Sequence, residues 1–130
     1  DRRPYSPSKR MTTEEAIDNV VGFLLDEYNV DVVFDDDEAG TYSPDARVIG
    51  IKDTDPEEEQ LFVLLHEAGH AKIHRDKRKL SRLAEEEVAW MEGRHLAQTL
   101  KININQRSWA PFCEKHLNDY REWMARCQQR

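Results

Sequence analysis

The chain has 130 residues, of which 38% are hydrophobic and 35% are charged, and it carries a formal net charge of -7. That length suits one domain with its own core, and the acidic balance argues against direct binding of nucleic acid, which needs a basic surface. No run of residues approaches the roughly 20 apolar positions of a membrane span. We therefore predict a single domain over 11–130, preceded by a flexible polar arm over 1–10.

The two cysteines, Cys113 and Cys127, are too few for a disulfide framework. If both lie on one helix, they are separated by about 21 Å along its axis, which a disulfide cannot span. We therefore expect reduced thiols and a cytoplasmic protein with no membrane partner.

The first half of the chain predicts a helix and then a small sheet. Thr12 and Glu15 match a capping box, and apolar residues recur at helical spacing over 13–28. Alternating apolar residues predict three strands, over 30–34, 41–42 and 47–51. We expect these strands to form an antiparallel sheet, whose last strand could offer a free edge to an extended peptide.

The second half predicts three helices, over about 56–75, 82–100 and 111–127. Pro56 suits the first position of the first helix, and Ser81 can cap the second. The basic run at 72–82 is local, and we interpret it as a solvated helix end and loop. The predicted fold class is α+β: an N-terminal helix, a small antiparallel sheet, a helix bearing the motif described next, a glutamate-bearing helix and a C-terminal covering helix.

The strongest functional signal is His66-Glu67-x-x-His70, which ends an apolar run in the first of these helices. Residues four apart share a helix face, so the imidazoles of His66 and His70 can bind one divalent metal ion of the zinc type. Glu67 follows His66 by about 100° of rotation, close enough to accept a proton from an activated water. The competing interpretation, a helix with two core histidines, leaves three polar side chains without partners.

Two histidines leave a third ligand to be found. His74 lies one turn beyond His70, but three residues in a row along a helix cannot surround an ion. We interpret His95 and His116 as ordinary histidines. The glutamates at 85–87 are better placed, because a loop and a returning helix would bring them back to the motif. A glycine at 69 costs about 1 kcal/mol relative to alanine, so we also expect another backbone to pass close to it.

The segment over 66–74 resembles the His-Glu-Leu-Gly-His-x-x-x-His motif of the ImmA/IrrE family of metallopeptidase domains. That family continues with a helix patterned Glu-x-x-Ala-x-x-x-Ala, whose glutamate completes the site. Here Glu86-x-x-Ala89 is similar to that pattern if Gly93 takes the second small position, and the small residues would let the two helices pack closely. The form Ala89-Trp90-x-x-Gly93 looks like the phage and prophage branch. The resemblance spans about 47–100.

By that register, the resemblance implies that His66, His70 and Glu86 bind Zn²⁺. Glu87 is the second choice for the third ligand, because the register rests on short motifs, and Glu85 is the third choice.

The resemblance implies a zinc metallopeptidase of gluzincin type that hydrolyses a protein or peptide, with Glu67 as general base. The sequence does not identify the residue that would stabilise the oxyanion: Tyr42, Tyr120 and His95 are candidates, and none of them is favoured. The alternative is a regulatory or interaction module, associated with a repressor or another phage or host protein, that keeps the metal but hydrolyses little. The presence of Glu67 favours hydrolysis. A purely structural zinc site is less consistent, because such sites usually have four ligands rich in cysteine.

Overall fold

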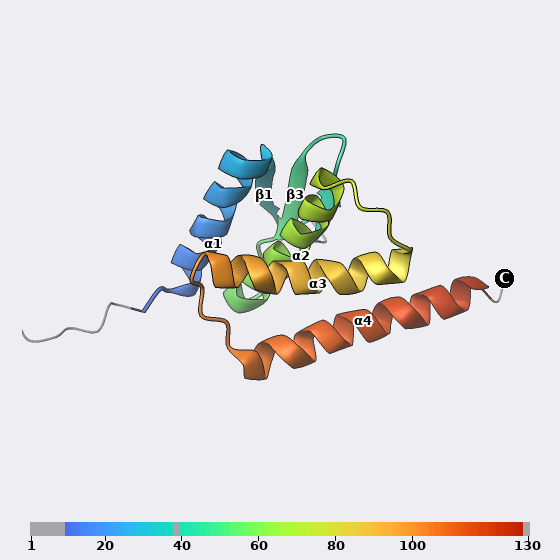
Figure 1. The fold of residues 1–130 in the computed structure, drawn as a ribbon. Helices are drawn as coiled ribbons and strands as arrows, with labels where there is room; N and C mark the ends of the chain where they lie inside the picture. Colours follow the sequence, from blue (N-terminus) through green and yellow to red (C-terminus); the bar gives the residue numbers. More distant parts are fainter. Residues whose placement is uncertain (1–9, 38–39, 129–130) are drawn as a thin grey trace, which may run out of the picture.

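The computed structural model describes residues 10–37 and 40–128 (Figure 1), so the arm predicted over 1–10 lies almost wholly outside the described residues. Its elements are, in order, α1 (Thr13–Phe23), the π-helix η1 (Leu24–Tyr28), β1 (Asp31–Asp35), β2 (Thr41–Ser43), β3 (Val48–Lys52), α2 (Glu57–Arg75), α3 (Arg82–Thr99) and α4 (Gln106–Gln128). The predicted α+β class is confirmed. Among the described residues, no helix is both long and apolar enough to cross a membrane.

Local signals define the ends of the first helical segment. The amide of Glu15 donates to the hydroxyl of Thr12 at 3.1 Å, and the amide of Thr12 donates to the Glu15 carboxylate at 2.9 Å, which confirms the predicted capping box. The helical run ends at Asn29, whose left-handed backbone (φ 55°) stops it. The predicted helix over 13–28 is therefore continuous, but its last five residues are wound as a π-helix.

The sheet is mixed, so the prediction of an antiparallel sheet was wrong. Its strand order is β1-β3-β2, with β1 parallel and β2 antiparallel to β3. The prediction that the last strand has a free edge was also wrong, because β3 lies in the centre. The physical reason is burial: Ile49 and Ile51 of β3 lie in the core, whereas most of β1 is exposed, so the most buried strand is paired on both sides.

The three long helices lie close to their predicted positions. The amide of Ala84 donates to the hydroxyl of Ser81 at 3.3 Å, which confirms the predicted cap of α3. α2 begins one residue later than predicted, so that Pro56 precedes its first turn. α4 begins at Gln106, before the predicted 111, because Asn105 accepts the amide of Arg107 at 3.0 Å and starts the helix ahead of Pro111.

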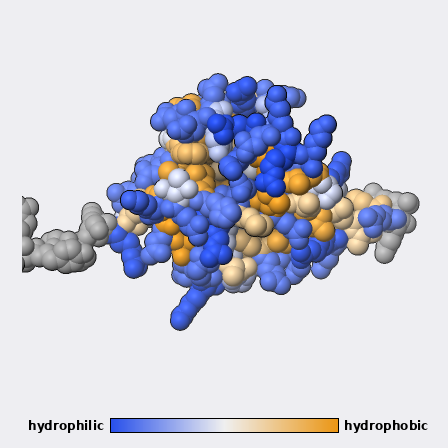
Figure 2. All heavy atoms as spheres, viewed as in Figure 1, coloured by the Kyte–Doolittle hydropathy of each residue, from blue (hydrophilic) through white to orange (hydrophobic). Residues whose placement is uncertain are grey.

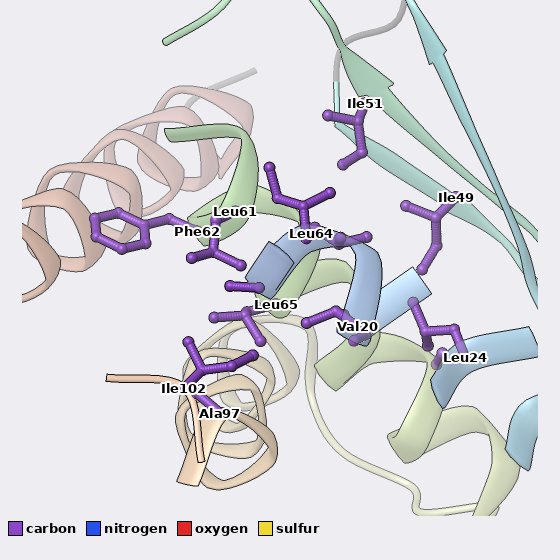
Figure 3. Close-up of a cluster of buried hydrophobic side chains, with 14 of the residues drawn as sticks. Val20, Leu24, Ile49, Ile51, Leu61, Phe62, Leu64, Leu65, Ala97 and Ile102 are labelled. Carbon is purple, nitrogen blue, oxygen red and sulfur yellow. The ribbon is translucent and has the colours of Figure 1, made fainter. Parts of the chain in front are cut away.

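α2 is the central element of the core (Figure 3). Its buried side chains contact α1, the sheet and the end of α3, through a cluster that includes Val20, Leu24, Ile49, Ile51, Leu61, Leu64, Leu65, Ala97 and Ile102. Phe62 reaches the other way, toward α4, where it meets Trp109 and Phe112 edge-on with ring centroids 5.1 Å and 5.4 Å away. Burial on all sides therefore fixes α2, the helix that carries the histidine motif.

Two glycines allow α2 and α3 to pack backbone to backbone. A methyl group at Gly69 would lie 2.0 Å from the carbonyl oxygen of Ala89, and one at Gly93 would lie 2.5 Å from that of Leu65. The close approach of another backbone predicted at Gly69 is thus confirmed. α3 and α4 run antiparallel to one another (Figure 1).

The face seen in Figure 2 is mostly hydrophilic, with hydrophobic atoms exposed between the polar side chains.

Candidate metal centre

α2 and α3 bring three potential metal ligands together. Nε2 of His66 lies 3.2 Å from Nε2 of His70, so both imidazoles point to one place. From α3, the carboxylate of Glu86 reaches both rings: Oε1 is 3.2 Å from Nε2 of His66, and Oε2 is 2.8 Å from Nε2 of His70. One ligand atom from each of the three residues lies within 4.8 Å of the others.

Glu67 lies at the edge of this cluster. Its side chain is buried, and its Oε2 lies 4.0 Å from Nε2 of His66. Burial, together with the charge of Glu86, raises the pKa of Glu67 to about 8, although His70 acts in the opposite direction. The carboxyl group is therefore beside the candidate ligands without being one of the three.

The other two glutamates of the cluster have different partners. Oε2 of Glu85 lies 2.8 Å from Nδ1 of His70 and 3.6 Å from Nε2 of His74. Glu87 points away and pairs with Arg121 of α4 at 3.1 Å. The three consecutive glutamates therefore have different partners. Glu85 contacts Nδ1 of His70, Glu86 contacts Nε2 of both histidines, and Glu87 contacts the covering helix α4. His74 lies next to Glu85 rather than in the cluster.

The charges of the cluster are strongly coupled. Burial acts to lower the pKa of His70, but the hydrogen bonds with Glu86 and Glu85 and the charge of Glu67 raise it to about 9. Burial acts to raise the pKa of Glu86, but its hydrogen bonds with His66 and His70 bring it down to about 2. The pKa of His66 is lowered, mainly by burial. Without a bound ion, the carboxylate of Glu86 therefore favours the protonated form of His70, 2.8 Å away.

The donor set fits a divalent metal ion. Two imidazole nitrogens and one carboxylate oxygen form the ligand set of catalytic zinc sites that keep a position open for water. The ring of His66 is held by Trp90, which stacks on it at a centroid distance of 4.0 Å and an angle of 19°. Nδ1 of His66 is buried and has no hydrogen-bond partner among the described residues, so stacking orients this ring.

A cavity of about 350 Å³ opens onto the cluster. Beside the cluster residues it is lined by Gly40, Val63, Trp90, His116, Asp119 and Tyr120. The last three belong to α4. His116 was interpreted from the sequence as an ordinary histidine, and its helical spacing from Tyr120 is the only sequence signal that could have singled it out.

The other candidates for an oxyanion-stabilising residue lie elsewhere. The ring centroid of Tyr42 lies 5.7 Å from that of His74, and Tyr42 lines a different cavity. His95 is exposed and lies 3.3 Å from Glu92. Of the three residues named from the sequence, Tyr120 alone lines the cavity at the cluster.

An α+β domain in which a His-Glu-x-x-His helix meets a glutamate of the following helix is a metallopeptidase-type domain. The family model of the IrrE N-terminal-like domain, peptidase family M78, matches residues 23–103, from the end of α1 through α3. The chain belongs to this family, which confirms the resemblance found in the sequence. Neither the search of curated proteins nor that of solved structures found a match.

Proposed function

We propose that this protein is a zinc-dependent endopeptidase in which His66, His70 and Glu86 bind the ion. The observation that carries the proposal is the reach of the Glu86 carboxylate, which lies within 3.2 Å of Nε2 of both histidines. Membership of a peptidase family supports the same reaction class. The substrate class is a protein or peptide. A zinc ion bound by these residues would polarise the scissile carbonyl and lower the pKa of a water molecule.

The residues of the chain carry the proton transfers. The charge of a bound zinc ion would lower the pKa of Glu67 from its value of about 8, so that its carboxylate could accept a proton from the attacking water and pass it to the amine that leaves when the peptide bond breaks. Its place beside His66 and its burial keep the carboxylate near the reaction and away from bulk water. When His70 is neutral and binds the ion, its Nδ1 would donate a hydrogen bond to Glu85, which leaves the lone pair of Nε2 for the metal.

α4 supplies the side chains that could contact the substrate carbonyl. His116 and Tyr120 both line the cavity at the cluster, and each can donate a hydrogen bond. Burial lowers the pKa of His116, so its imidazole is neutral at pH 7 and keeps one N–H donor. Either donor could stabilise the charge that develops on the carbonyl oxygen.

The test is cleavage of a mixed peptide library by zinc-loaded protein, with products identified by mass spectrometry. Wild type should cut the library, and Glu67→Gln should bind zinc equally well but cut nothing. Glu87→Gln is the matched control, because it makes the same change on the neighbouring helix and leaves the cluster intact. A wild type that binds zinc but leaves both the library and unfolded protein intact would favour the alternative of a regulatory metal-binding module.

A further inference from the structure

A second cavity of about 360 Å³ lies at the C-terminal end of α2. It is lined by two tyrosines, four basic side chains and three small or apolar residues: Tyr28, Tyr42, Arg47, His74, Arg75, Lys77, and Val30, Pro44 and Ala71. No aspartate or glutamate is among these lining residues. In a chain with a net charge of -7, a cavity walled only by basic and neutral residues needs an explanation.

Two of the four basic residues lack a compensating charge. Arg75 pairs with Asp76 at 3.6 Å and His74 lies 3.6 Å from Glu85. By contrast, Arg47 and Lys77 form no ion pair with any residue in 10–37 or 40–128. Because Arg47 and Lys77 line the same cavity without such partners, both would attract an anion placed between them.

The same two residues have an unfavourable backbone. Arg47 has a φ of 54° and Lys77 a φ of 55°, the left-handed region in which glycine is the preferred residue. Lys77 follows the last turn of α2, where its amide donates to the carbonyl of His74 at 3.1 Å, a place that glycine usually occupies. At both positions the chain therefore carries a long basic side chain where glycine would fit the backbone better.

The two tyrosines of the cavity hold a cation in place and supply hydrogen-bond donors. The guanidinium of Arg75 lies 5.0 Å from the centre of the Tyr28 ring, which holds one cation in place. Burial raises the pKa of Tyr28 and of Tyr42, so both hydroxyls remain protonated and can donate to an oxyanion.

We propose that this cavity binds an oxyanion group, a carboxylate or a phosphate, between Arg47 and Lys77. Charge-assisted hydrogen bonds from Arg and Lys to such oxygens are among the stronger polar contacts in proteins. The site is separate from the candidate metal centre and does not depend on proteolysis. The two centres are nevertheless neighbours, since Glu85 contacts His70 of one and His74 of the other.

The test is a titration of ¹⁵N-labelled protein with inorganic phosphate and, separately, with glutarate, at constant ionic strength. We expect saturable shifts of the amide signals of Tyr42, Arg47 and Lys77. The ion that binds more tightly tells whether the natural group is a phosphate or a carboxylate. Arg47→Gly and Lys77→Gly should each weaken binding roughly tenfold or more, because each removes a charged donor. Both keep the backbone, since glycine accepts a positive φ.

Lys101→Gly is the matched control. Lys101 also follows the last turn of a helix, with a φ of 59°, but it does not line the cavity. The control should bind the ion like wild type. Absence of saturable binding by either ion would overturn the proposal. So would wild-type affinity in both cavity variants, or an equal loss in Lys101→Gly, which would show that only net charge matters.

Discussion

Nδ1 of His70 lies 2.8 Å from Oε2 of Glu85, while Nε2 of the same ring lies 2.8 Å from Oε2 of Glu86. Two adjacent residues of α3 thus hold the two nitrogens of one imidazole. A carboxylate that hydrogen-bonds to Nδ1 fixes the tautomer of the ring and raises the basicity of Nε2. If His70 binds the ion as proposed, Glu85 would position its ring without being a ligand.

Glu85→Gln should weaken zinc binding without abolishing it. Loss of the carboxylate charge beside Nδ1 makes His70 a poorer ligand. Such changes typically cost about 10- to 100-fold in metal affinity. Competition with a chelating dye measures the effect. An affinity equal to that of wild type would contradict the positioning role.

Glu86→Gln and Glu87→Gln should differ in metal content. We expect wild type to bind about one zinc ion per chain and Glu86→Gln to lose it, because a neutral amide is a poor zinc ligand. Glu87→Gln breaks only an exposed ion pair with Arg121, worth about 1 kcal/mol or less, and should keep its zinc. Metal analysis of the three proteins, purified in parallel, tests this expectation. Loss of zinc from Glu87→Gln alone would show that Glu87 is the third ligand.

Gly69→Ala and Gly93→Ala should each destabilise the fold. A methyl group at either position would meet a backbone carbonyl of the facing helix, and overpacking of this kind costs roughly 1–3 kcal/mol. Gly22→Ala is the control, because a methyl group there meets nothing within 4 Å. It should raise stability by up to about 1 kcal/mol through helix propensity. Urea unfolding measures all three, and unchanged midpoints for Gly69→Ala and Gly93→Ala would disprove the close packing.

The zinc-free protein should lose stability as the pH rises from about 4.3 to about 8, because of Glu67. The pKa of Glu67 is about 8 in the folded chain and about 4.3 in an unfolded one, so the folded state binds this proton more tightly. Its contribution is fully present below about pH 4.3 and is lost as the pH rises through 8. Glu67→Gln should therefore gain stability over wild type between pH 5 and 9, as measured by urea unfolding after removal of zinc. A difference that does not change with pH would contradict this.

His116→Asn and Tyr120→Phe test which residue of α4 assists hydrolysis. Loss of one donor to the oxyanion typically lowers kcat about 10²- to 10³-fold, and we expect that loss in at least one variant, with zinc content unchanged. Leu117→Ala, on the same helix but not lining the cavity, controls for loosening of α4. A kcat equal to that of wild type in both variants would show that neither residue of α4 assists hydrolysis.

Local patterns in the sequence determined the elements and the position of the motif. The capping box at Thr12, the cap at Ser81 and the four-residue spacing of His66 and His70 depend only on nearby residues and on helix geometry, so they could be predicted. The family motif likewise singled out Glu86 among three adjacent glutamates.

Only the tertiary structure decided what depends on segments far apart in the chain. β3 is the central strand because α2 buries its side chains Ile49 and Ile51. The alternation of apolar and polar residues along each strand cannot reveal this strand order. The different partners of Glu85 and Glu87 follow from the rotation of α3 against α2 and α4. His116 reaches the cavity because Phe62 packs α4 beside α2. Arg47 and Lys77 line one cavity because the turn before β3 lies next to the end of α2.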